Sequence, residues 1–121
     1  MKEELIAFDT AKLAKEKGFN IPCNDFYDLY DNPNNKNLSY SLKDNWNDYK
    51  SYSAPTQSLL QKWLREVHEI YVITRPYKMS DKYKFFVTIS SNEDNPTFEN
   101  KFDTYEEALE KGLQKALKLI K

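Results

Sequence analysis

The stretch YKFFVTIS, residues 83–90, decides the fold of the carboxyl-terminal half of the chain. Apolar or aromatic side chains occupy every second position of this stretch: Tyr83, Phe85, Val87 and Ile89. A period of two is typical of a β-strand that buries one of its faces. We therefore predict a strand over residues 83–90.

Two further strands are predicted, one on each side of residues 83–90. Residues 70–74 form a β-branched and aromatic run. We expect Arg75 and Pro76 to end this strand, because proline cannot donate a hydrogen bond to a neighbouring strand. Residues 97–102 have the composition of a third strand. Three short consecutive strands predict an antiparallel sheet that needs helices to cover one face.

Helices are predicted before and after these strands. Between residues 55 and 68, apolar side chains recur at helical spacing: Leu59, Leu60, Trp63, Leu64 and Val67. Residues 104–120 begin with a capping box, in which the Thr104 hydroxyl can accept a hydrogen bond from the Glu107 amide. An apolar stripe and carboxyl-terminal lysines follow. Both segments are therefore predicted to be helical.

The amino-terminal part of the chain has a different character. We predict a helix over residues 1–18, ended by a left-handed cap at Gly18. Residues 20–53 contain eight asparagines and five tyrosines, which favours turns and short strands. A hairpin that joins residues 26–30 to residues 37–41 is the simplest arrangement for this irregular segment.

Together these elements predict an α+β fold in a single domain. The chain has 121 residues and a mass of 14.4 kDa, the length of one ordinary domain. We expect one domain over residues 1–121, with an N-terminal helix and an irregular or hairpin segment. The order helix-strand-strand-strand-helix follows over residues 55–121, as a three-stranded antiparallel sheet covered by helices.

Charge and composition exclude several classes of function. Eighteen Lys and Arg residues against 19 Asp and Glu residues give a net charge of -1, which excludes a globally basic nucleic-acid binder. One cysteine and one histidine cannot form an intramolecular disulfide or a Cys/His zinc site. Two glycines are too few for the glycine-rich loops that hold phosphates. We therefore expect no metal and no cofactor.

The residues that most often carry chemistry are assigned structural roles. His68 stands at a predicted helix end, where a cation suits the helix dipole. Cys23 suits a small buried side chain, and Asp25, Asp28 and Asp31 do not follow the order of a calcium loop. We assign no catalytic residue and expect a non-enzymatic protein. A site built from carboxylates alone leaves no sequence signature, so that alternative stays open.

Trp46, Tyr49 and Tyr52 form the candidate surface for a partner. Their spacing would place them on one face if this part of the chain were a helical turn or two. Tryptophan and tyrosine supply large, rigid contact areas at interfaces. The alternative is that they seal the long segment onto the core. The partner would be another protein. One option is a second copy of this chain, which would form a homodimer.

Residues 82–86 support an alternative function in nucleic-acid binding. Lys82 and Lys84 alternate with aromatic residues that include Phe86. Single-stranded nucleic acids bind to such strips, because lysines hold phosphates while aromatic rings stack on bases. The same residues also fit an ordinary half-buried strand. The alternative function is thus a nucleic-acid-binding module of αβββα topology that uses its sheet surface.

Two strings, APTQSLLQKWLREVH at residues 54–68 and FDTYEEALEKGL at residues 102–113, resemble small uncharacterised proteins carried by phages and mobile elements of gut bacteria. The resemblance covers mainly residues 54–121 and implies a phage-related protein in the cytoplasm of a bacterial host. The topology is also similar to the double-stranded RNA-binding domain. Glu106 and Glu107, however, stand where that domain has phosphate-binding lysines, so nucleic acid is an unlikely partner.

The expected setting is the cytoplasm, without membrane association. The first residues mix acids and bases and lack the apolar run of a secretory signal. No stretch has the about 20 apolar residues that a membrane span requires. The leading expectation is therefore a non-enzymatic, phage-related cytoplasmic protein that acts through protein–protein interaction.

Overall fold

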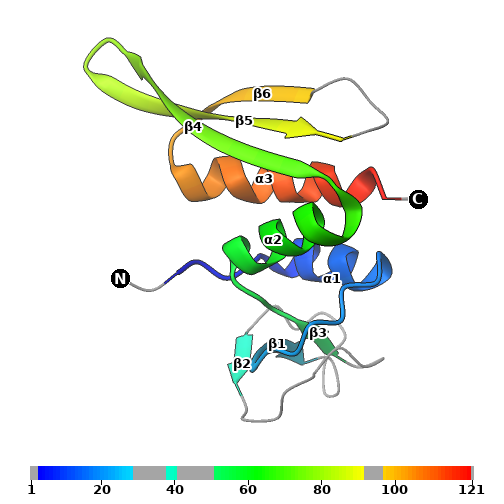
Figure 1. Ribbon diagram of the computed structural model, residues 1–121. Helices are drawn as coiled ribbons and strands as arrows, with labels where there is room; N and C mark the ends of the chain where they lie inside the picture. The colour runs from blue at the N-terminus through cyan, green and yellow to red at the C-terminus, as the bar shows by residue number, and fades with distance from the viewer. Residues whose placement is uncertain (1–2, 29–37, 41–50, 92–96, 121) are drawn as a thin grey trace. The chain divides into compact units, whose positions relative to one another are not determined.

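A computed structural model describes residues 3–28, 38–40, 51–91 and 97–120 (Figure 1). Within it the chain divides into two compact units, Met1–Thr56 and Gln57–Lys121. The fold class is α+β, and the predicted order helix-strand-strand-strand-helix of the second half is confirmed. The expectation of a single domain over residues 1–121 stays a prediction.

The first unit combines one helix with a small sheet. It contains α1 (Phe8–Glu16), β1 (Asp25–Asp28), β2 (Leu38–Tyr40) and β3 (Ser51–Ser53). The strands are antiparallel in the order β2-β1-β3. The pairing of β1 with β2 agrees with the predicted hairpin. β3 was not predicted, since three residues with serine on both sides of a tyrosine give no recognisable alternation.

Helix α1 begins at Phe8, so the predicted start near residue 1 is wrong. The preceding residues are extended instead, because Leu5 forms a β-bridge with Thr56 and the Ile6 amide donates to the Pro55 carbonyl at 3.0 Å. Ile6 is also buried, with 1% of its surface exposed. Tertiary pairing and burial therefore override the helical tendency of this segment.

The end of α1 follows the predicted cap. Gly18 has a φ of 94°, in the left-handed region that favours glycine. The Phe19 amide donates to the Ala14 carbonyl at 3.0 Å, and the Gly18 amide donates to the Lys15 carbonyl at 3.1 Å. These two bonds form a Schellman motif, which satisfies carbonyls that the helix leaves unpaired.

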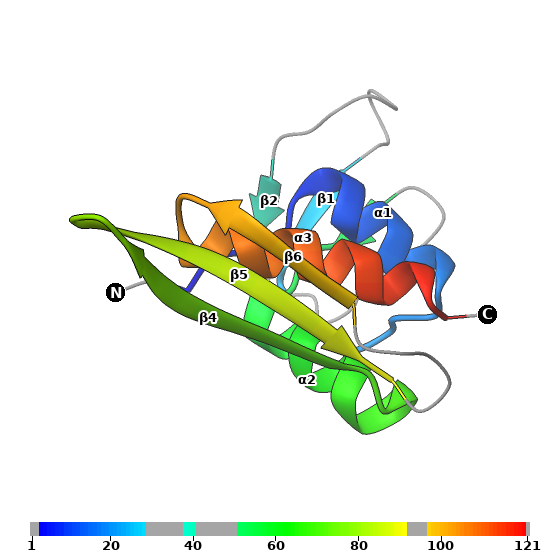
Figure 2. The ribbon, with the colours of Figure 1, turned by 90° about the horizontal axis from the view of Figure 1, so that it is seen from above.

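The second unit is a three-stranded sheet with two helices. It contains α2 (Gln57–His68), β4 (Tyr71–Met79), β5 (Lys82–Ser90), β6 (Thr97–Phe102) and α3 (Tyr105–Lys118). The strands are antiparallel in the order β4-β5-β6. Seen from above they lie side by side, with α3 passing beneath them (Figure 2). Helix α2 packs against α3 and β4.

The core of the second unit lies between the sheet and its helices. Its members come from α2, β4, β5 and α3, and they include Leu60, Leu64, Val72, Val87, Ile89, Leu109, Leu113 and Leu117. Helix α3 starts with the predicted cap, because the Glu107 amide donates to Thr104 Oγ1 at 3.1 Å. The Gln57 side chain ties α2 to α3 by donating to the Glu106 carbonyl and to Glu110 Oε1, each at 3.0 Å.

Strand β4 does not end at Arg75 and Pro76, as the sequence predicted, but continues to Met79. β4 is an edge strand, so only alternate residues direct their backbone groups toward β5. Because a two-residue turn joins Met79 to Lys82, the odd-numbered residues of β4 are the ones whose backbone N–H and C=O groups point toward β5. Consistently, the carbonyl of Val72 accepts a hydrogen bond from Gln61 of α2. Pro76 therefore lies at an outward position, where its missing N–H costs the sheet no hydrogen bond.

In the described part of the chain, no helix combines the length and the apolar character that crossing a membrane requires.

Candidate functional site: the open face of the sheet

The predicted partner surface is only partly within the described residues. Trp46 and Tyr49 lie outside them. Tyr52 lies in strand β3, so the helical spacing that grouped it with the other two does not apply to it. Its ring is 5.7 Å from the ring of Phe8, and Lys15 Nζ is 5.3 Å from its centroid. Tyr52 thus packs within the first unit, as expected of a residue that seals a segment onto its core.

Cys23 and His68 have the surroundings of structural residues. The Cys23 thiol donates to the Ile21 carbonyl at 3.2 Å, and burial is the main reason that its pKa rises to about 11. A thiol with so high a pKa is a poor nucleophile at neutral pH. The His68 ring lies 4.7 Å from the ring of Trp63 in an edge-to-face contact. Among the described residues, no three His, Cys, Asp or Glu side chains are grouped as a metal site would need.

The sheet of the second unit has one face that α3 does not cover. Val72 and Val87 are buried and lie against Gly112 of α3. Side chains alternate between the two faces of a strand, so the intervening residues of β4 and β5 point away from α3. We call the surface formed by these residues the open face. Its members are Tyr71, Ile73, Arg75, Tyr77 and Met79 of β4, and Lys82, Lys84, Phe86, Thr88 and Ser90 of β5.

The three residues singled out for nucleic-acid binding all belong to the open face. Lys82, Lys84 and Phe86 occupy alternate positions of β5 and share its side. Their neighbours on β4 were missed, because the strand was expected to stop at Arg75. The period-two pattern of residues 71–79 is the signal that could have found them.

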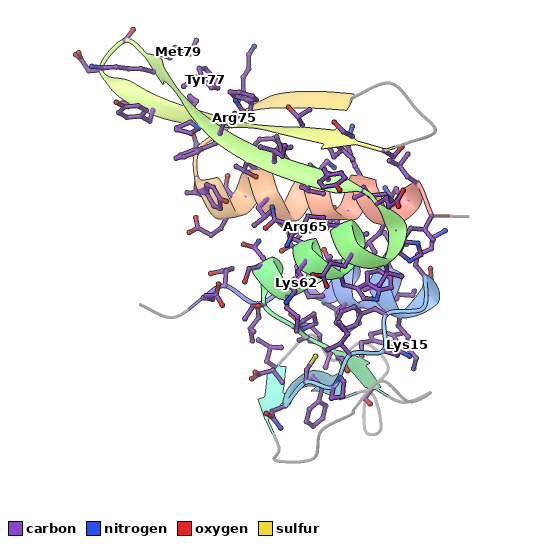
Figure 3. All side chains as sticks on the ribbon, in the orientation of Figure 1. Lys15, Lys62, Arg65, Arg75, Tyr77 and Met79 are labelled. Carbon is purple, nitrogen blue, oxygen red and sulfur yellow. The ribbon has the colours of Figure 1, made fainter. Side chains whose placement is uncertain are left out.

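Large apolar and aromatic side chains are accessible on the β4 side of the open face. Tyr71 is 45% exposed, Ile73 41% and Met79 53%. The ring of Tyr77 lies 6.0 Å from the ring of Phe86 on the neighbouring strand. Figure 3 shows how Arg75, Tyr77 and Met79 follow one another toward the tip of the hairpin. The β4 side of the open face therefore carries three exposed large apolar or aromatic side chains, and Tyr77 forms an aromatic pair with Phe86 of β5.

The hairpin that carries the open face is basic. Residues 71–90 contain four basic side chains, Arg75, Lys78, Lys82 and Lys84, and one acidic side chain, Asp81. Arg75 is exposed and stands opposite Phe86 in the strand register. In the described ranges, Arg75 makes no ion pair.

Lys84 is the basic residue of the open face that already has an acidic partner. It forms an ion pair with Asp103, which follows β6. The hydrogen bond and the charge of Asp103 raise the pKa of Lys84, and those of Lys84 lower the pKa of Asp103. Because both groups are exposed to solvent, this pair adds little to stability. Its effect is to remove one positive charge from the open face.

The outer part of the hairpin is a two-stranded ribbon. Pairing of β6 with β5 ends where Phe102 stands opposite Phe85, whereas β4 and β5 remain paired as far as Met79 and Lys82. The ribbon consequently projects past the end of β6 (Figure 2). Ser80, at the first position of the turn, has a φ of 58°, as a type II′ turn requires. The projecting ribbon makes this part of the open face reachable by a large partner.

A scan of protein-family models finds no match to the chain, and comparisons with curated proteins and with solved structures return no similar protein.

Proposed function

We propose that the chain is a non-enzymatic protein-interaction module whose contact surface is the open face formed by residues of β4 and β5. The observation that carries this proposal is the row of exposed large side chains on β4. Tyr71, Ile73 and Met79 each expose more than two-fifths of their surface. Single exposed apolar residues are ordinary, but several of them on one face of one strand indicate a binding surface.

The composition of the row supports a protein partner. Tyrosine, phenylalanine, methionine and arginine are enriched at the centres of protein interfaces, whereas lysine and acidic residues are depleted there. The β4 side of the open face has tyrosine at residues 71 and 77, arginine at 75 and methionine at 79, without lysine or acid. The strand that carries this row is paired with β5 along its whole length, so the surface is formed before a partner binds.

A pull-down with a matched control tests the proposal. The tagged full chain would serve as bait in a nuclease-treated bacterial lysate, alongside the variants Tyr71→Ser and Tyr83→Ser. Tyr83 is 60% exposed and lies on the same hairpin, but its side chain is on the opposite face of β5 from Phe86. We expect a bound protein that Tyr83→Ser retains and Tyr71→Ser loses. Equal loss or equal retention in both variants would contradict the assignment of the surface.

A second candidate function is binding of single-stranded nucleic acid by the same face. The specific observation in its favour is that Lys82, Lys84 and Phe86 share one side of β5, with the Tyr77 ring 6.0 Å from that of Phe86. Against it, Lys84 is paired with Asp103, and Ile73 and Met79 offer no aromatic ring to a base.

Anisotropy of a labelled oligothymidine measures the second candidate directly. Binding that weakens steeply as salt rises and is lost in Lys82→Glu would support nucleic acid. Absence of binding at low salt would remove this candidate.

The resemblance to phage-borne proteins supports a setting for the proposed module. We place it in the cytoplasm of a bacterial host. Its partner there would be a host protein, a phage protein or a second copy of the chain. Fractionation of host cells that express the tagged chain checks this placement.

A further inference from the structure

We infer that the partner's contact segment is acidic as well as apolar, with a carboxylate that pairs with Arg75. This inference rests on the proposed function, because it describes what the open face would bind. Its starting point is an imbalance of charge. The open-face positions of β4 and β5 include three basic residues, Arg75, Lys82 and Lys84, and no acidic one. Asp103 pairs with Lys84, so Arg75 and Lys82 carry the remaining positive charge.

Arg75 lies where a partner on the open face would bury its positive charge. It is the central residue of the β4 row, between Ile73 and Tyr77, and it stands opposite Phe86. A partner that covers the apolar neighbours of Arg75 also removes water from its guanidinium. Burying an unpaired charge is costly, whereas a planar guanidinium binds a carboxylate through two parallel hydrogen bonds. A partner that lies over this row therefore needs a carboxylate close to Arg75.

Lys82 adds a second positive charge at the tip of the ribbon. It is exposed, stands opposite Met79, and lies on the same side of the sheet as Arg75. Positive charge at both places favours a partner segment with more than one acidic residue, spaced by apolar ones. Such complementarity determines which partner is accepted and raises the rate of association.

An acidic protein segment fits these residues better than a nucleic acid does. Nucleic acids need several phosphate contacts for affinity, and pairing with Asp103 removes Lys84 from the available cations. Apolar side chains such as Ile73 and Met79, 41% and 53% exposed, fit the aliphatic or aromatic side chains of a protein.

Selection from a displayed library of random peptides tests the inference. The full chain, freed of nucleic acid by nuclease, would be immobilised as the target. The peptides that bind to it would then be identified by sequencing. We expect enrichment of peptides that combine Asp or Glu with large apolar residues. A selected peptide should lose at least about tenfold in affinity when Arg75 is changed to glutamate.

Lys78→Glu is the matched control for Arg75→Glu. It makes the same change of charge on the same exposed strand, but at a position that alternates onto the opposite face. We expect it to change affinity by less than about twofold, since long-range effects between exposed charges are screened by salt.

The other outcomes separate the two proposals. Neutral or basic peptides that Tyr71→Ser loses and Arg75→Glu retains would overturn the acidic partner while leaving the open face as an interaction surface. Failure to select any peptide, or binding that neither variant affects, would overturn both. Displacement of the selected peptides by oligothymidine, with direct and salt-sensitive oligothymidine binding, would replace both by the nucleic-acid function.

Discussion

Gly112 of α3 lies against Val87 of β5 so closely that a Cβ atom at residue 112 would be 2.5 Å from Val87 Cγ2. Val72 Cγ1 would be 2.8 Å away, so the glycine faces two branched side chains from neighbouring strands. Carbon atoms that are not bonded to each other essentially never come this close in proteins. The absence of a side chain at residue 112 therefore lets α3 approach the sheet, which holds the strands of the open face in place.

Replacing Gly112 by alanine should destabilise the protein. Alanine normally stabilises a helix interior by about 1 kcal/mol relative to glycine. Here we expect the opposite sign, a loss of roughly 1–3 kcal/mol, because the added methyl group overpacks the contact with Val87. Urea denaturation measures the change, with the exposed neighbouring variant Lys111→Ala as a control that stays within about 0.5 kcal/mol.

The double variant Gly112→Ala with Val87→Ala gives an internal check. Removing the valine methyl groups makes room for the new Cβ, so the double variant should lose less stability than the sum of the two single losses. Additive losses would show that the close contact is not the cause.

Replacing Pro76 by threonine should promote association of the chain. Pro76 stands at an outward position of the β4 edge and withholds an N–H that another strand could pair with. Threonine restores this donor on an exposed strand that also bears apolar side chains. We expect concentration-dependent self-association by sedimentation velocity, with little change in the stability of the monomer. Sedimentation like that of the unaltered chain, or equal association in Lys78→Thr, would refute the protective role.

Replacing Asp103 by asparagine should strengthen binding of acidic peptides. The change releases Lys84 from its ion pair and restores a positive charge to the open face. We expect an affinity gain of about two- to fivefold, measured by titration calorimetry, because exposed charges act through solvent. Glu106→Gln, which removes the same charge from an exposed position of α3, should gain less. A weaker or unchanged affinity in Asp103→Asn would contradict the electrostatic account.

Cys23 should react slowly with alkylating reagents while the protein is folded. Burial raises its pKa from the ordinary value of 9.0 to about 11, so the folded chain at pH 8 contains about a hundredfold less thiolate. Iodoacetamide labelling followed by mass spectrometry should be slow at pH 8, faster toward pH 11, and rapid at pH 8 in urea. Equal rates in the folded and unfolded chain at pH 8 would contradict this prediction.

The sequence predicts the second unit well because its signals there are local. Alternation over residues 83–90 gives β5, and the Thr104 cap gives the start of α3, each from side chains adjacent in the chain. The extended start of the first unit depends instead on pairing of Leu5 with Thr56, which no local signal encodes. Non-local pairing of this kind lies beyond single-sequence patterns.

The candidate site was predictable only on its β5 side. Lys82, Lys84 and Phe86 could be grouped by alternation alone. The β4 residues of the site were not predicted, because proline ordinarily ends a strand. Only the order of the strands in the sheet shows that Pro76 lies on an edge strand, where proline is tolerated. The pairing of Lys84 with Asp103 was equally hidden, since it depends on how β6 lines up with β5.

Hydroxyl-radical footprinting of the full chain, alone and with its bound partner, tests the central claim most directly. Met79, Tyr71, Tyr83 and Tyr105 are all exposed, at 53%, 45%, 60% and 42%, and all carry reactive side chains. If the open face is the contact surface, the partner protects Met79 and Tyr71 from oxidation and leaves Tyr83 and Tyr105 reactive. Protection of Tyr83 or Tyr105, with Met79 and Tyr71 still oxidised, would contradict the account.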